Sequence, residues 1–196
     1  MKKLSIVSVL ILLLAFTSCK NNKETDVETS NLEATEMKAS EIEKAEKKIV
    51  VAMHSSSNSN VQGEVVFTEN NGFVKMQGEF SGLNPEGIHA IHLHEKADCS
   101  AADGSSAGGH WNPTDEKHGK WDAADGFHLG DIGNLKVDKN GNASITFETD
   151  EWCIDCADDR KNIIGKGIIV HKDKDDFTSQ PTGNAGDRIS CGEINL

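Results

Sequence analysis

Between residues 48 and 196 the chain divides into eight short runs of alternating apolar and polar residues, and this pattern constrains the fold most. Alternation with a period of two is typical of β-strands that bury one face. Turn residues separate the runs, most clearly at 69–72 (ENNG) and 138–141 (DKNG), where Asn and Gly tolerate the positive φ of tight hairpins. The spacing predicts an all-β antiparallel sandwich or barrel. The expected strands are 48–54, 61–69, 72–80, 87–94, 131–138, 143–149, 165–172 and 187–194.

Two long stretches, 95–130 and 172–187, interrupt the strand pattern and are rich in Gly, Asp, Ser and Lys. Irregular loops of this length inside a compact domain are usually functional or disordered. The first stretch contains three histidines, two tryptophans and a cysteine, which favours a function. We expect Trp111 to pack under this loop, whereas Trp121 and Trp152 fit either a buried cover or an exposed contact.

The N-terminus predicts export. Lys2 and Lys3 precede an apolar run that ends in TSC at Cys19, which indicates a signal peptide over 1–18. Small residues before Cys19 favour lipidation of that cysteine over an ordinary cleaved signal with a free Cys19. Residues 19–47 are polar and acidic, as expected for a lipid-anchored tether, and 48–196 has the size of one domain. We therefore expect a bacterial lipoprotein, anchored to a membrane in the periplasm or at the cell surface.

Charge and cysteine content narrow the class of protein. The full chain carries a net charge of −12, which becomes −14 once Lys2 and Lys3 are removed with the leader. A basic footprint for nucleic acid is therefore absent from the sequence, and we expect no nucleic-acid partner. Apart from Cys19, the chain has an even number of cysteines in an oxidising compartment, which predicts two disulfides but leaves three pairings open.

The histidines are the strongest indication of chemistry. In a strand over 87–94, His92 and His94 project from the same face as a candidate chelating pair, while His89 lies on the other face and is expected to be structural. His54 lies beside SSSNSN and is expected at the surface. Imidazole nitrogens are common ligands of transition metals. Further candidate ligands follow along the chain: His110, His118, His128, Asp131 and His171.

Read in order, GIHAIHLH, Cys99, GGHWNP, KHG, FHLGDIGN, GIIVH and TGNAGDRISCG resemble the copper/zinc superoxide dismutases over nearly all of 49–196. The resemblance implies an eight-stranded antiparallel Greek-key β-barrel, an immunoglobulin-like sandwich with two long functional loops. It also implies two metal sites that share His110. The implied copper ligands are His92, His94, His110 and His171, and the implied zinc ligands are His110, His118, His128 and Asp131.

The same resemblance implies a reaction, the disproportionation of superoxide to dioxygen and hydrogen peroxide. His110 would supply a proton, and Arg188 would bind the anion beside copper. Asp175 would link the copper-side and zinc-side histidines, although Asp176 is its neighbour. The resemblance further implies a Cys99–Cys191 disulfide.

Cys153 and Cys156 form a C-x-x-C motif that the common family pattern lacks. A local disulfide is favoured over a reactive dithiol because no βαβ pattern surrounds the motif, and capture of a soft metal is a third reading. This motif keeps a second function open, an exported copper-binding or copper-delivery protein on the same barrel. The complete zinc set and Arg188 favour the enzyme.

The loop over 172–187 is shorter than the charged guidance loop typical of the animal enzymes that the chain resembles, and it contains four aspartates. Lys172 and Lys174 are its only lysines, so we expect weak electrostatic steering of superoxide. The resemblance leaves a homodimer open, and nothing in the sequence marks its interface.

Overall fold

The computed structural model describes residues 46–196, whose regular structure is eight strands and one short 3-10 turn, η1 (Ser105–Ala107). The expected leader, tether and lipidated Cys19 fall almost wholly on residues 1–45, outside the described residues. In the part described, no helix is long and apolar enough to span a membrane. The strands are β1 (Lys47–Ser55), β2 (Gln62–Asn70), β3 (Phe73–Ser81), β4 (Ile88–His94), β5 (Asp131–Lys136), β6 (Ala143–Thr149), β7 (Gly167–His171) and β8 (Arg188–Glu193).

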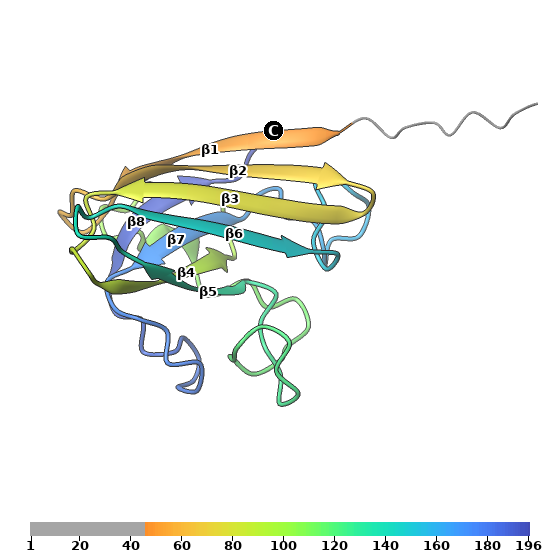
Figure 1. Ribbon diagram of the computed structural model, residues 1–196. Helices are drawn as coiled ribbons and strands as arrows, with labels where there is room; N and C mark the ends of the chain where they lie inside the picture. Colours follow the sequence, from red (N-terminus) through yellow and green to blue (C-terminus); the bar gives the residue numbers. More distant parts are fainter. Residues whose placement is uncertain (1–45) are drawn as a thin grey trace, which may run out of the picture. The chain divides into compact units, whose positions relative to one another are not determined.

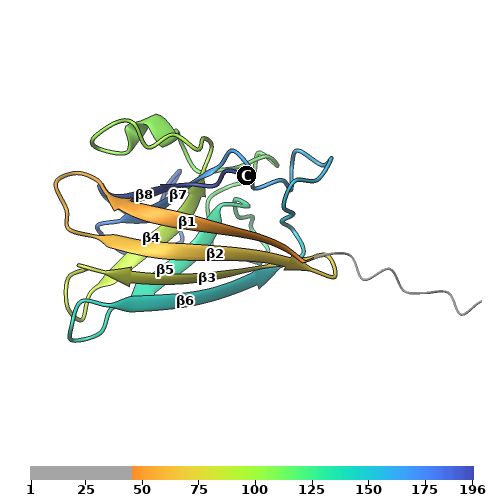
Figure 2. The same ribbon diagram turned by 90° about the horizontal axis from the view of Figure 1, so that it is seen from above.

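All neighbouring strands pair antiparallel, in the order β5-β4-β7-β8-β1-β2-β3-β6. The two end strands, β5 and β6, lie next to each other, so the sheet curls into a nearly closed barrel (Figures 1 and 2). β4, β5 and β6 follow one another, and β7 returns to lie beside β4, which is a Greek key. The predicted fold class is therefore confirmed.

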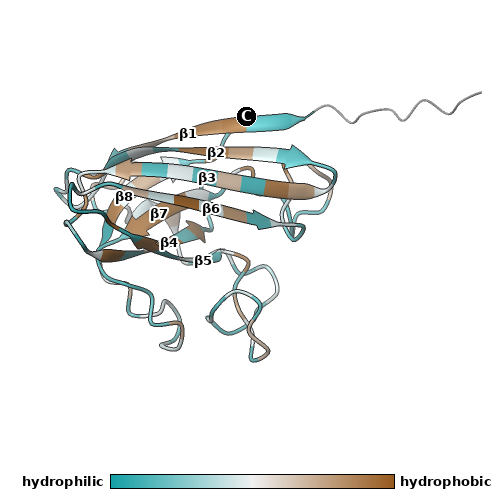
Figure 3. Cartoon of the chain, in the orientation of Figure 1, coloured by the Kyte–Doolittle hydropathy of each residue, from teal (hydrophilic) through white to brown (hydrophobic). Residues whose placement is uncertain are grey.

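The β2–β3 hairpin has the turn that its sequence predicts. Asn70 pairs with Phe73, and both turn residues have positive φ, 51° at Asn71 and 84° at Gly72. Such a turn matches the twist of the two strands that it joins. Every second residue is buried from Val65 to Glu69 in β2 and from Val74 to Phe80 in β3, and Figure 3 shows apolar and polar bands along β3.

One apolar core fills the barrel, and each large side chain fully buried in it contributes roughly 1.5–3 kcal/mol to stability. β4, apart from its first residue, and β7 are buried on both faces along their whole length. Their inner face meets the core, and their outer face lies under the long loops. Trp111 and Trp152 are buried, and Trp121 packs against the core. All three tryptophans therefore cover the apolar core of the barrel and are not exposed contacts for a partner.

The two long loops fill the β4–β5 and β7–β8 connections, 95–130 and 172–187, as the sequence predicts. In Figure 1 parts of both hang below β4 and β5. The Cys99–Cys191 disulfide ties the first loop to β8, with a Cα–Cα distance of 5.8 Å. A third connection, 150–166 between β6 and β7, contains the Cys153–Cys156 disulfide.

Candidate metal centre

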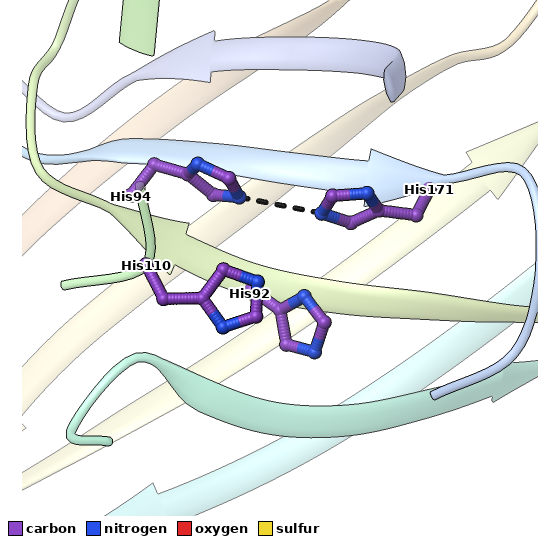
Figure 4. A group of neighbouring side chains, drawn as sticks. All are labelled: His92, His94, His110 and His171. Atoms are coloured by element: carbon purple, nitrogen blue, oxygen red, sulfur yellow. Dashed lines mark hydrogen bonds between the residues drawn. The ribbon is translucent and has the colours of Figure 1, made fainter. Parts of the chain in front are cut away.

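Four imidazoles from three parts of the chain meet on the outer face of β4 and β7 (Figure 4). His92 and His94 project from β4, and His171 is the last residue of β7. His110 comes from the long loop and is held against β4 by a β-bridge to His94. All four side chains are buried, and one ring nitrogen of each lies within 4.8 Å of the others.

The second group surrounds Asp131, the first residue of β5. One carboxylate oxygen lies 2.9 Å from Nδ1 of His110 and 3.3 Å from Nδ1 of His128, and the other lies 3.0 Å from Nδ1 of His118. The backbone N–H groups of Gly119 and His128 donate to this second oxygen, at 3.1 and 2.8 Å. Three imidazoles and one carboxylate therefore converge on one buried point.

His110 belongs to both groups. Its Nδ1 faces Asp131, whereas its Nε2 is buried and has no hydrogen-bond partner. Nδ1 of His92 is likewise buried and unpartnered. Nδ1 of His118 and of His128 are close to Asp131 but are not aligned for a hydrogen bond.

Buried polar atoms without a partner are costly, and lone pairs that converge in this way are what a metal ion satisfies. The donor sets also fit the two metals that the sequence predicts. Four nitrogens suit copper, and three nitrogens with a carboxylate suit tetrahedral zinc.

Asp175 connects the two groups through their outward-facing ring nitrogens. One oxygen lies 2.8 Å from Nε2 of His92, and the other lies 2.9 Å from Nε2 of His118. Gly183 passes so close that a Cβ there would lie 2.0 Å from Asp175 Oδ1. The neighbouring Asp176 has another role, because it caps a turn through Thr178 and Ser179. Of the two aspartates, Asp175 alone has the linking position.

The protonation of the groups suits cation binding. Burial and the neighbouring imidazoles hold the pKa values of His94 and His171 well below the usual range. Burial also lowers the pKa of His110, to about 4, although the hydrogen bond to Asp131 opposes this. These three rings are therefore neutral at pH 7, with lone pairs available for a metal.

The two carboxylates are held in the ionised form. Burial would raise the pKa of Asp175, but hydrogen bonds from His118 and His92 lower it to about 2. Burial acts in the same direction on Asp131, and the three surrounding imidazoles hold its pKa well below the usual range. Burial would lower the pKa of His118, but the hydrogen bond to Asp175 and the nearby carboxylate of Asp131 raise it to about 9. The negative charge around His118 thus calls for a cation.

Arg188 begins β8 and is half-buried beside the first group. Its Nη1 donates to the carbonyl oxygen of Gly104 and its Nη2 to that of Gly108, both at 2.6 Å. Both glycines have positive φ, 71° and 78°, a backbone conformation that glycine adopts without steric cost. The charge of Arg188 also lowers the pKa of His94 and His171, although burial is the larger cause. The structure thus holds a fixed cation next to the four imidazoles.

The remaining histidines agree with their expected roles. Nδ1 of His89 donates to the backbone carbonyl of His171 at 3.0 Å, so His89 is a buried structural residue. His54 is exposed. Sequence reasoning missed two residues that contact the site, Asn134 and Gln180. Asn134 exchanges two hydrogen bonds with the backbone of Asp175, and Gln180 exchanges two with the backbone of His118.

The disulfide between Cys153 and Cys156 agrees with the favoured reading of that motif. Trp152, the residue before it, donates its indole N–H to the carbonyl of Leu129 at 2.8 Å. Ile154, within the disulfide loop, donates its N–H to Glu69. The segment therefore packs between the β2–β3 end of the barrel and the residue that follows His128.

Comparison with known proteins agrees with the geometry. The family model for copper/zinc superoxide dismutase (SODC) matches residues 61–194. The chain is 34% identical to an extracellular Cu-Zn superoxide dismutase of Haemonchus contortus over 168 residues, which cover 81% of this chain and 86% of that protein. It is 40% identical to an extracellular Cu-Zn superoxide dismutase of Drosophila melanogaster over 151 residues, which cover 72% and 79%.

Solved structures of this kind share the fold. A superoxide dismutase-like protein from Bacillus subtilis superposes with a TM-score of 0.66 at 28% identity, covering 74% of this chain and 97% of that one. The clock protein EA4 superposes with a TM-score of 0.66 at 31% identity, covering 76% and 94%. With two adjacent ligand groups sharing one histidine, and with the family model matching more than half of its length, this chain belongs to the copper/zinc superoxide dismutase family.

Proposed function

We propose that this chain disproportionates superoxide with copper held by one group of side chains and zinc by the other. One observation supports this above all: His110 stands between the groups with one ring nitrogen facing Asp131 and the other free of any hydrogen bond. The proposed copper ligands are His92, His94, His110 and His171, and the proposed zinc ligands are His110, His118, His128 and Asp131.

Copper, when bound, supplies the one-electron chemistry that converts two superoxide ions and two protons into dioxygen and hydrogen peroxide. The protein must bring the anion to this point and provide a proton there. Nε2 of His110 is the atom placed to hold that proton, because it is buried and unpartnered while Nδ1 is engaged by Asp131. Zinc is redox inert, so we assign the zinc half a structural role, which is to hold the ring of His110 in place.

Arg188 is proposed to bind superoxide. The two hydrogen bonds to Gly104 and Gly108 fix the guanidinium, so the side chain need not be ordered when the anion arrives. A fixed positive group also stabilises the negative charge that develops on the peroxide. Its other N–H groups remain available to the anion.

The second candidate function, copper binding or delivery, is less well supported. It would use Cys153 and Cys156 as an additional thiolate site, and the two are joined in a disulfide. A copper store also has no need of a fixed anion-binding arginine beside its ligands. Arg188 is the residue that favours the enzyme.

We further propose that the chain is exported and attached to a membrane through a lipid on Cys19. Two disulfides fit an oxidising compartment, and two of the relatives are extracellular enzymes. The proposed division is a leader over 1–18, an acidic tether over 19–47 and the catalytic domain over 48–196, placing the enzyme in the periplasm or at the cell surface. Assembly into a homodimer remains a prediction, which the mass of the protein in solution tests.

The deciding experiment measures superoxide dismutation by purified residues 20–196, together with copper and zinc content, before and after copper reconstitution. Activity that rises with copper occupancy is expected. A His171→Ala variant should lose copper and activity and keep zinc, whereas His54→Ala, which alters an exposed histidine outside the site, should lose neither. Full metal occupancy with negligible activity would instead support copper handling.

A further inference from the structure

His118 lies in an irregular part of the first long loop, so no strand fixes its backbone. One side chain takes over this task. The N–H of His118 donates to Oε1 of Gln180 at 2.9 Å, and Nε2 of Gln180 donates to the carbonyl oxygen of His118 at 2.8 Å. Gln180 belongs to the second long loop, so a single amide joins the two loops at a proposed zinc ligand.

The chemistry of this contact requires an amide. A primary amide presents an acceptor and a donor side by side, which matches the N–H and C=O of one residue. A carboxylate could accept from the N–H but would face the carbonyl oxygen with a second acceptor, and an ammonium group could not accept. Glutamine therefore satisfies both backbone groups of His118 in a way that glutamate or lysine would not.

The turn that presents Gln180 is itself well ordered. The carboxylate of Asp176 accepts the N–H groups of Thr178 and Ser179, at 2.9 and 2.8 Å. It also accepts from the side chains of Ser179 and Asn184, at 2.7 and 3.1 Å. Asp175, next to this capping residue, binds Nε2 of His118. The second loop thus holds His118 at its ring through Asp175 and at its backbone through Gln180.

We infer that Gln180 is a positioning residue that sets the place of His118 in the zinc half of the proposed site, an inference that rests on the proposed function. Asp175 fixes only the Nε2 end of the imidazole, while Nδ1 must face the cluster around Asp131, 3.0 Å away. The ring can contact both Asp175 and Asp131 only if the backbone of His118 is held at a fixed distance from each carboxylate. Gln180 is exposed, so truncating it leaves no buried cavity and acts through these two hydrogen bonds.

The test compares zinc retention in the full chain and in three variants. Gln180→Ala removes both hydrogen bonds, and Gln180→Glu keeps the size of the side chain but loses the donor. Gln77→Ala makes the same truncation at an exposed glutamine of β3 and is the matched control. Each protein is loaded with zinc alone, and the rate of zinc transfer to a chromogenic chelator is measured. Cobalt(II) is then placed in the zinc half, and its visible spectrum reports ligand geometry.

Both Gln180 variants should release zinc about tenfold faster, the usual effect of removing a group that orients a metal ligand. Their cobalt spectra should change, while copper retention and the Gln77→Ala control stay as in the parent chain. Zinc release and a cobalt spectrum identical to the parent would overturn the inference. So would an equal loss of copper and zinc with a lowered unfolding temperature of the metal-free protein, which would make Gln180 a general support. A parent chain that takes up no zinc would overturn the zinc site itself.

Discussion

Arg188 and His94 donate to the same acceptor, the carbonyl oxygen of Gly108, at 2.6 and 2.9 Å. The proposed anion-binding group and a proposed copper ligand are therefore positioned by one peptide of the first long loop. The Cys99–Cys191 disulfide joins the same loop to β8, the strand that Arg188 begins. Movement of this loop would remove a hydrogen-bond acceptor from both groups at once.

Replacement of Arg188 by alanine should lower dismutation while leaving copper content unchanged. A fixed donor to a developing anion is worth roughly ten- to a hundredfold in rate, allowing for the charge that the metals retain. The measurements are steady-state dismutation and copper per chain. Arg160→Ala, at an arginine with 72% of its side chain exposed, removes the same charge outside the site and should behave as the parent. Loss of copper from Arg188→Ala would make Arg188 a structural group.

Replacement of Asp175 by alanine should weaken zinc binding by roughly ten- to a hundredfold and alter the copper spectrum, because Asp175 holds one ring of each group. Zinc competition with a chelator and electron paramagnetic resonance of copper measure the two effects. Asp159→Asn, which removes an exposed carboxylate from the β6–β7 connection, is the control. Unchanged zinc binding would show that the histidines keep their orientation without this link.

Gly183→Ala should disturb the site through the space that a methyl group occupies. A Cβ there would lie 2.0 Å from Asp175 Oδ1 and 2.6 Å from His118 Nε2. Gly72 is the matched control because its φ is also positive, +84° against +64°, yet nothing lies within 4 Å of a Cβ. Both variants should lose about 1 kcal/mol of stability to backbone strain. Gly183→Ala alone should lose zinc, and equal zinc retention in the two variants would contradict this.

The strand pattern and the parity of His92 and His94 could be predicted because each depends on the period of a strand, which is local. The other ligands came from resemblance, since irregular loops have no period that tells where a side chain points. Asn134 and Gln180 could not be predicted. Their partners lie 41 and 62 residues away along the chain, in loops whose path follows from the folded barrel. An amide that binds a distant backbone leaves no pattern in its own neighbourhood.

The two disulfides should differ in what their removal costs. In the chain-entropy account, a disulfide stabilises the folded state more when it closes a longer loop of the chain. The sequence separations of 92 and 3 correspond to about 4–5 kcal/mol for Cys99–Cys191 and about 2 kcal/mol for Cys153–Cys156. Serine in place of both Cys153 and Cys156 should therefore lower the unfolding temperature and spare specific activity. A large loss of activity in the fully metallated variant would assign the pair a part in function.

Asp187 stands next to Arg188, and its carboxylate lies 3.7 Å from Nζ of Lys172. Both side chains are more than half exposed, so this pair contributes little stability. Asp187 does affect an approaching anion, because its negative charge offsets that of Lys172, one of only two lysines in the second long loop. Asp187→Asn should raise kcat/KM for superoxide about twofold at low ionic strength, and the gain should vanish as salt screens the approach.

Asp159→Asn makes the same charge change on the β6–β7 connection and separates this local effect from that of net charge. An equal gain in both variants would mean that the overall negative charge of the chain limits the approach of superoxide. A gain confined to Asp187→Asn would place the limit at the residues beside Arg188. In that case the acidic second loop, which holds His118 through Asp175 and Gln180, keeps the zinc half in place at the cost of slower capture of an anion.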